Sequence, residues 1–203
     1  MNLLSASLPA VAIEANQKRS PMIITLKLRK VFVASLIFAT SFSSAAMAQN
    51  LIETSQWSYF TDTVMGGVSN GSASIEIKGT NKTIRLKGQV STANNGGFIQ
   101  VRTLIPKRLI KQKIGIKLKV KGNGQEYYLH IRTSNTRLPW HYYQQGFDTT
   151  NSWSEVKLPF ESFTKSSAVL RTKLNPEFIK SIGIVAYGKD HLADVSVMEL
   201  EFY

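Results

Sequence analysis

The 203-residue sequence contains no cysteine and only 13 acidic side chains. Without cysteine the chain has no disulfide, no thiol nucleophile, no thiolate zinc site and no cysteine-held iron–sulfur cluster. The 25 Lys and Arg residues outnumber the acids and give a formal net charge of +12. The hydrophobic fraction of 43% excludes a long disordered chain, and the composition excludes collagen. A large part of enzyme chemistry is therefore excluded from the start.

Residues 1–48 differ in composition from the rest of the chain. They hold no glycine, no tryptophan and a single acid, Glu14. Three basic residues precede the apolar run VFVASLIF and a final AMA, which is the layout of a secretory signal peptide. We expect an N-terminal extension with a signal peptide cleaved after Ala48, a periplasmic location, and translation from Met1 or Met22. A retained anchor is the alternative, because the apolar segment is at the short edge of a membrane span.

Residues 49–203 have the length of one domain. They hold 20 basic and 12 acidic side chains, which leaves a net charge of +8. A chain of this length hides roughly 70% of its unfolded surface on folding, enough for a core without metal or disulfide.

Apolar and polar residues alternate along much of this domain, and period two predicts half-buried strands. Glycine, asparagine and proline occupy nearly every gap between the alternating runs. About nine short strands predict an all-β fold, a jelly-roll β-sandwich, with one short helix. That helix is expected to be capped by Asn175, with Pro176 at its first position and Gly183 as its stop. The expected strands are Ile75–Lys78, Ile84–Val90, Phe98–Thr103, Ile114–Val120, Tyr127–Thr133, Trp140–Phe147, Ser154–Leu158, Ile182–Ala186 and Val195–Phe202.

Sequence motifs for catalysis occur without the context that they need. Gly67–Gly71 spells the GxSxG nucleophile elbow, but an alternating strand pattern follows Ser69 where a helix is required. The three histidines, His130, His141 and His191, have no partner at a metal-ligand spacing. We therefore predict a protein that is not an enzyme and has no cofactor and no metal.

Two glycine-rich segments, residues 62–71 and 94–98, stand out from ordinary turns. Paired glycines let a ligand or a partner chain approach the backbone closely. Two tight turns are the alternative interpretation. Asp62 and Arg102 are expected to form an ion pair that braces these segments, because Arg102 lies on the strand that leaves the second one.

The segment Lys107–Lys121 has seven basic residues and no acid. Within it Lys117, Lys119 and Lys121 alternate with apolar residues and form a lysine ladder on one face of a strand. Such a face suits anionic lipid, acidic polysaccharide or an acidic protein surface. The alternative is a solvated face that blocks edge-to-edge pairing. Nucleic acid is a poor partner for a secreted chain.

The segment RLPWHYYQQGF places Trp140 and Tyr142 on one face of a strand and His141 and Tyr143 on the other. One face must be core. The other face, if exposed, suits sugar rings or a protein hot spot. Packing of both aromatics in the core is the alternative.

Taken in order, Trp57, DTVMGGVS, NNGGF with Arg102, KGNGQEYYL and Trp153 with LPF resemble the complex I intermediate-associated protein 30 family. The resemblance implies a galactose-binding-like jelly roll over residues 49–203. It also implies a non-catalytic role, because mitochondrial members act as assembly factors. Asn123 replaces an acidic residue of the family, which argues against a cation there. The residues expected to form a partner- or ligand-binding surface are Asp62, Met65, Gly66, Gly67, Ser69, Asn95, Gly96, Gly97, Phe98 and Arg102.

The leading hypothesis is a non-catalytic periplasmic protein that binds a protein partner through its glycine-rich loops, as an assembly factor or chaperone does. An envelope or respiratory complex intermediate is the expected partner, and the lysine ladder would assist the encounter. The alternative is a carbohydrate-binding module of the galactose-binding-like fold, with Trp140 and Tyr142 stacking on a sugar.

Overall fold

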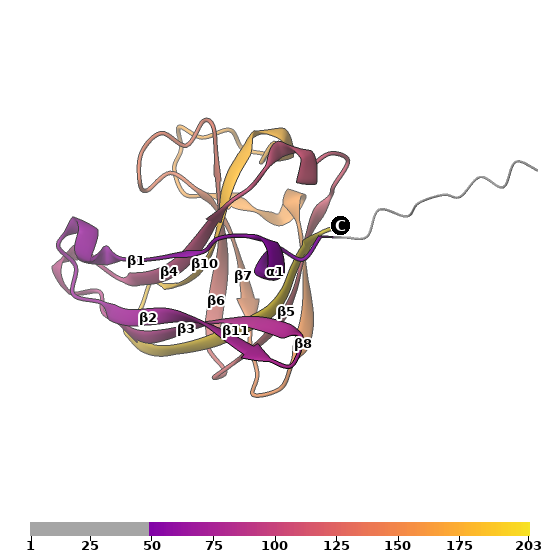
Figure 1. Cartoon of the computed structure of the whole chain (residues 1–203). Coiled ribbons are helices and arrows are strands. Elements are labelled where there is room, and N and C mark those ends of the chain that lie inside the picture. Colours follow the sequence, from indigo (N-terminus) through magenta and orange to yellow (C-terminus); the bar gives the residue numbers. More distant parts are fainter. Residues whose placement is uncertain (1–48) are drawn as a thin grey trace, which may run out of the picture. The chain divides into compact units, whose positions relative to one another are not determined.

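The computed structural model describes residues 49–203, and these form two antiparallel β-sheets that face each other (Figure 1). The predicted signal peptide and both candidate start residues lie outside the described residues. Within the described range, no helix has both the length and the apolar character needed to cross a membrane.

One turn of α-helix, α1 (Leu51–Thr54), precedes the sheets, and five short 3-10 turns lie between strands. The 3-10 turns are η1 (Asp62–Met65), η2 (Ala93–Asn95), η3 (Lys107–Leu109), η4 (Phe160–Ser162) and η5 (Pro176–Phe178). The strands are β1 (Ser58–Thr61), β2 (Asn70–Lys78), β3 (Asn81–Val90), β4 (Phe98–Leu104), β5 (Gly115–Gly122), β6 (Glu126–Thr133), β7 (Tyr143–Asp148), β8 (Ser154–Pro159), β9 (Thr164–Lys165), β10 (Ile179–Tyr187) and β11 (His191–Phe202).

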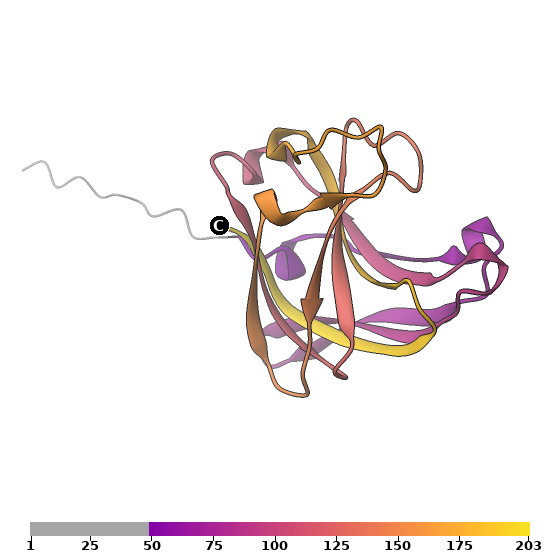
Figure 2. The same ribbon diagram turned by 180° about the vertical axis from the view of Figure 1, so that it is seen from behind.

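The strands divide between a six-stranded sheet, in the order β1-β4-β10-β6-β7-β9, and a five-stranded sheet, in the order β2-β3-β11-β5-β8. Figure 2 shows the same two layers from behind. Every strand pairing within residues 49–203 is antiparallel. The predicted all-β jelly-roll sandwich is confirmed.

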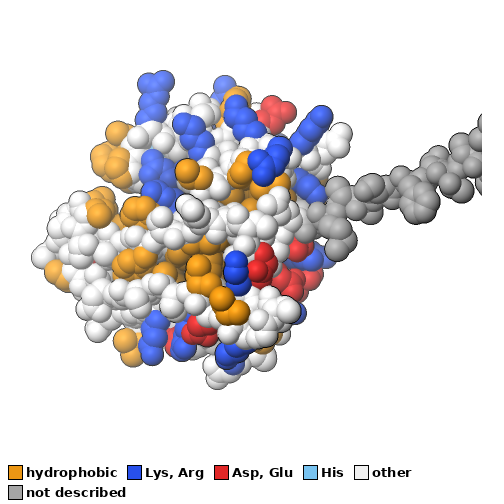
Figure 3. All heavy atoms as spheres, viewed as in Figure 1, with side chains coloured by type: hydrophobic (Ala, Val, Ile, Leu, Met, Phe, Trp, Pro, Cys, Tyr) orange, Lys and Arg blue, Asp and Glu red, His pale blue; other side chains and the backbone are white. Residues whose placement is uncertain are grey.

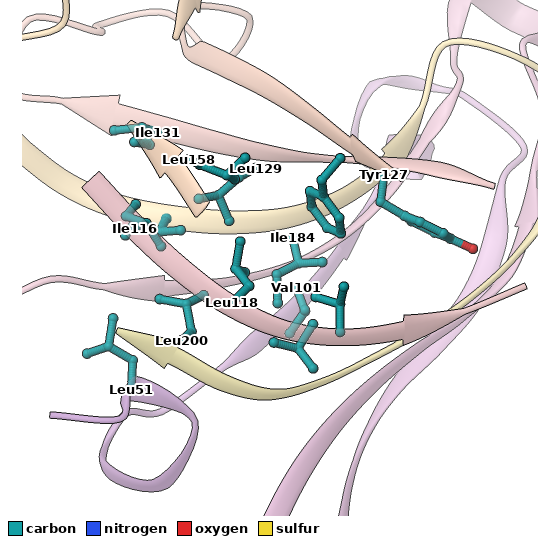
Figure 4. Close-up of a cluster of buried hydrophobic side chains, with 14 of the residues drawn as sticks. Leu51, Val101, Ile116, Leu118, Tyr127, Leu129, Ile131, Leu158, Ile184 and Leu200 are labelled. Atoms are coloured by element: carbon teal, nitrogen blue, oxygen red, sulfur yellow. The ribbon is translucent and has the colours of Figure 1, made fainter. Parts of the chain in front are cut away.

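The core lies between the sheets, where the inward residues of most alternating strands meet. The strand predicted at Ile75–Lys78 is an exception, because Ile75 and Ile77 on β2 are exposed and not half-buried as expected. Leu118 on β5 and Leu200 on β11 come from the five-stranded sheet, while Leu129 on β6 and Ile184 on β10 come from the other (Figure 4). All four side chains are fully buried. Burying a leucine or isoleucine stabilises the fold by about 1.5–3 kcal/mol, so these inward side chains contribute strongly to holding the two layers together.

The expected helix after Asn175 is wrong in extent. Asn175 does cap a turn, because its Oδ1 accepts a hydrogen bond from the Glu177 amide at 3.0 Å. The turn is 3-10 and ends at Phe178, since the apolar run from Ile179 onward belongs to the central strand β10. The one α-helical turn of the described chain is α1, which Asn50 caps.

The lysine ladder lies on β5, which is an internal strand of the five-stranded sheet. It therefore does not protect an edge. Lys117 Nζ lies 3.5 Å from Glu201 and 3.9 Å from Glu155, and Lys119 Nζ lies 3.5 Å from Glu199. Neighbouring strands thus neutralise most of a face that looked purely cationic in the sequence; Lys121 is exposed.

Candidate functional site

The outer face of the six-stranded sheet is hollowed into a groove of about 400 Å³. Its floor is formed by β4, β10 and β6, where Arg102 pairs with Gly183 and Gly183 pairs with His130. Gly183 has no side chain to fill the space between its two neighbours. At this register a guanidinium, an uncovered stretch of backbone and an imidazole lie side by side on the groove floor.

Aromatic rings form one wall of the groove. The rings of His130 and Tyr142 are stacked, with centroids 4.0 Å apart and planes 12° apart. Tyr187 meets His130 edge-on at 5.1 Å and Tyr128 at 4.7 Å. The Tyr187 hydroxyl donates to Gln144 Oε1 at 2.6 Å. These contacts fix the rings before any ligand binds, and ring pairs of this kind contribute about 0.5–1.5 kcal/mol each.

Burial also sets the charge of this wall. It lowers the pKa of His130 to about 3, so the imidazole is neutral at pH 7. It raises the pKa of Tyr142 to about 12. The His130 Nε2 atom is buried and has no hydrogen-bond partner among residues 49–203. The wall therefore offers ring faces and polar atoms without a charge of its own.

Two half-buried arginines supply the positive charge of the groove. The Arg102 guanidinium lies 4.4 Å from the centroid of the Phe60 ring. Arg132 donates to the carbonyls of Thr136 and Leu138 at 3.1 and 2.8 Å. Burial lowers the pKa of both groups, and the charge of Arg102 lowers that of Arg132 further. No Asp or Glu of the described chain lines the groove.

The predicted ion pair between Asp62 and Arg102 is wrong. The Asp62 carboxylate is fully buried and accepts hydrogen bonds from the Ser69 amide at 3.0 Å, the Phe98 amide at 3.2 Å, the Ser69 hydroxyl and the Gly97 amide. Burial alone would raise the pKa of Asp62, but the hydrogen bonds from Gly97, Ser69 and Phe98 outweigh it and the pKa is lowered. Asp62 does brace the two glycine-rich segments, through backbone amides.

The paired glycines serve the same brace. A Cβ on Gly67 would lie 2.3 Å from Asp62 Cγ, and one on Gly96 would lie 2.5 Å from Asp62 Oδ2. Gly66 and Gly97 have φ of 87° and 123°, which L side chains rarely adopt. The close approach that the glycines allow is between the two loops of this chain, so the tight-turn interpretation holds for their backbone.

The surface predicted from the sequence therefore separates into two groups. Asp62, Ser69 and Gly67 are buried and have no surface for a partner, while Gly96 and Gly97 pack within the loop corner and Gly66 and Asn95 lie on its exposed turns. The groove residues are Met65, Phe98, Arg102, Trp140 and Tyr142.

Trp140 and Tyr142 reach the groove from the connection between β6 and β7. The predicted strand from Trp140 is wrong at its start, because β7 begins only at Tyr143. The predicted burial of one side does hold, since His141 and Tyr143 are buried. Trp140 lies in a turn before β7 and is 57% exposed, so it is not a core residue. Val64, from η1, is 72% exposed and adds an apolar rim to the groove.

Strand β6 also contributes to the groove, and none of the motifs singled out in the sequence predicts this. Tyr128, His130 and Arg132 alternate with the buried Tyr127, Leu129 and Ile131, so one face of the strand carries only large polar or aromatic side chains. This alternation is visible in the sequence and predicts an outward face of β6 that carries aromatic and polar side chains. Figure 3 shows Lys and Arg side chains spread over much of the face drawn, so positive charge by itself does not mark the groove.

The arrangement provides no reactive centre at the motif that resembled one. Ser69 is 1% exposed, its hydroxyl donates to Asp62, and β2 follows it directly. Among residues 49–203, no three His, Asp or Glu side chains are arranged to hold a metal ion. What the groove offers is recognition: flat rings, two guanidiniums and a fixed shape.

Comparison with known proteins gives one family and one fold. The family model described as Complex I intermediate-associated protein 30 (CIA30) matches residues 41–195. No curated protein matches the chain. Among solved structures, the family 11 carbohydrate-binding module of the cellulosomal cellulase Lic26A-Cel5E of Clostridium thermocellum is similar, with a TM-score of 0.63 and 16% identity over 78% of this chain and 95% of the module.

A second structure shows a Clostridium thermocellum family 11 module in complex with a β-1,3-1,4-mixed-linked tetrasaccharide. Its TM-score is 0.59 at 17% identity, covering 72% of this chain and 87% of that one. At these identities the likeness concerns the fold.

Proposed function

Because the chain belongs to the complex I intermediate-associated protein 30 family, we propose that it is a non-catalytic binding domain whose groove holds an oligosaccharide. The observation that carries this proposal is the rigid aromatic wall beside polar groups in one groove. Sugar rings present flat apolar faces and many hydroxyls, and that wall is complementary to both.

The size of the groove supports an oligosaccharide. Its volume of about 400 Å³ lies within the range of small-ligand sites. The ring of Tyr142 is held in place by His130, so it loses little freedom when a sugar packs on it. A module with a similar fold binds a tetrasaccharide, which adds support for this class of ligand.

A protein partner is the second candidate, and the rim favours it. Val64, Met65 and Trp140 are 72%, 51% and 57% exposed and lie around the same groove. Exposed apolar side chains around a pocket are typical of protein interfaces. An intermediate of an envelope complex is the proposed partner in that case, and the signal-peptide pattern supports a periplasmic location for either function.

The replacements Trp140→Ala and Tyr142→Ala are each expected to weaken oligosaccharide binding at least tenfold, or about 1.4 kcal/mol. Both remove a ring face from the groove without disturbing the core. Affinity electrophoresis against a panel of neutral and acidic polysaccharides measures the loss. Trp153→Ala is the matched control, because Trp153 is a half-exposed tryptophan in a hollow on the other sheet.

Two results would count against the oligosaccharide. One is a wild-type protein that none of the panel retards; the other is equal retardation of the Trp140 and Trp153 variants. Binding to a purified membrane-complex intermediate that Trp140→Ala abolishes would favour the protein partner.

A further inference from the structure

We infer that the groove selects acidic sugars, with Arg102 and Arg132 binding the carboxylate of a uronic acid whose ring lies against Tyr142. This inference rests on the proposed function and names its ligand class. It follows from where the two guanidiniums lie, from their lack of acidic partners and from the contrast with the other sheet.

The two arginines flank a strip of small residues. Arg102 on β4 pairs with Gly183 on β10, and Arg132 on β6 pairs with Ser181 on β10. Both side chains line the groove, and they are near enough for the charge of one to lower the pKa of the other. Since nothing larger than a serine stands between them on β10, one anionic group over that strand is within reach of both.

Neither arginine has an acidic partner. The seven ion pairs found among residues 49–203 all involve other basic residues. Arg85, on the five-stranded sheet, bonds both Asp194 oxygens at 2.7 and 2.8 Å and also lies near Glu76. Arg85, Lys117 and Lys119 of that sheet are thus paired with acids of this chain, whereas Arg102 and Arg132 of the groove are paired with none within residues 49–203.

Holding two unpaired guanidinium groups in the groove is electrostatically unfavourable, and a bound anion would relieve that penalty. Partial burial disfavours both guanidinium charges, and each repels the other. The Phe60 ring lies against the Arg102 guanidinium and stabilises its charge. Within residues 49–203 the Arg102 N–H donors have no hydrogen-bond acceptor, so they are available to a ligand. A carboxylate accepts two parallel hydrogen bonds from such a donor and cancels the repulsion as well. A neutral sugar would leave both charges unpaired.

A uronate fits the groove better than an acidic peptide. The neutral imidazole of His130 adds no charge, so the positive potential is confined to the two arginines. Beside the arginines, the aromatic wall of His130, Tyr142 and Tyr187 is complementary to a flat apolar face of a ligand. A uronic acid carries both features within one ring.

The test measures binding of the protein to oligomers of galacturonate, mannuronate and guluronate, each beside its carboxyl-reduced neutral counterpart, by isothermal titration calorimetry. We expect at least one charged oligomer to bind tenfold or more tightly than its neutral form. Arg102→Gln and Arg132→Gln should each reduce that ratio to about two or less. Arg85→Gln, on the opposite sheet, should leave it unchanged. Unchanged circular dichroism of each variant establishes that it is folded.

The outcomes separate this inference from the proposed function. If charged and reduced oligomers bind with equal affinity, and Tyr142→Ala abolishes binding of both, the acidic selectivity is overturned and the sugar site is retained. A charge preference that survives both arginine variants also overturns the inference. Binding of no oligosaccharide overturns both proposals, and binding of an oligoglutamate peptide alone, sensitive to Arg132→Gln, assigns the arginines to a protein partner.

Discussion

Replacing Asp62 with alanine is expected to lower the free energy of unfolding by about 3–5 kcal/mol. The carboxylate is fully buried and accepts hydrogen bonds from three backbone amides and from the hydroxyls of Ser69 and Thr61. Alanine would leave the buried amides of Ser69 and Gly97 unsatisfied and would open a cavity between the glycines packed on that side chain. Urea denaturation followed by tryptophan fluorescence measures the loss.

Asp190→Ala is the matched control. Asp190 accepts hydrogen bonds from the Thr92 amide and hydroxyl at 2.7 and 2.8 Å, but at an exposed site. Its removal should therefore cost much less, because water replaces the lost acceptor. Similar losses in the two variants would mean that burial of the Asp62 brace does not stabilise the fold.

The same carboxylate predicts a dependence of stability on pH. Its folded-state pKa is lowered, so its contribution is complete above the unfolded pKa of about 3.9 and is lost as pH falls through the folded value. In Asp62→Asn that contribution is absent at every pH. The stability difference between wild type and Asp62→Asn should therefore be constant from pH 7 to pH 5 and shrink below about pH 4. A difference that stays constant down to pH 2 would contradict this assignment.

Gly183→Leu is expected to weaken ligand binding at least 50-fold while the protein stays folded. A Cβ at this position would meet only Gln100 Oε1 closely, at 3.1 Å, and that atom is at the end of a flexible side chain. The leucine would then occupy the groove floor between Arg102 and His130, where the ligand must lie. Titration calorimetry with the tightest oligosaccharide of the panel measures the effect.

Ser196→Leu adds the same side chain to the outer face of the other sheet and should leave affinity unchanged. If Gly183→Leu bound as tightly as wild type, the ligand would lie elsewhere on the molecule.

The sequence was sufficient to predict the fold class, because alternation is a local property of each strand. All nine predicted strands are present. The two that were missed, β1 and β9, have four and two residues, too few for a pattern. The family resemblance is confirmed by the match over residues 41–195. The predicted extent of the helix is wrong, because the cap at Asn175 marks only where a helix can begin. It does not reveal that the residues from Ile179 onward pair within a β-sheet.

The candidate site was less predictable because strand pairing is not local. Lys117 faces Glu201, 84 positions later, and the sequence around Lys117 contains no acid. The Asp62 brace likewise joins residues 35 positions apart. Alternation predicts a strand through Trp140 and Tyr142, but β7 begins only at Tyr143. The groove that both residues line depends on which strands are neighbours in the six-stranded sheet, and the sequence does not reveal that order.

The location of the binding site can be measured from amide chemical shifts of the isotope-labelled protein during titration with the tightest-binding oligosaccharide. We expect saturable shifts confined to β4, β10, β6 and the turn at Trp140, with the oligosaccharide recovered intact. Shifts confined to the five-stranded sheet, or cleavage of the oligosaccharide, would contradict this prediction.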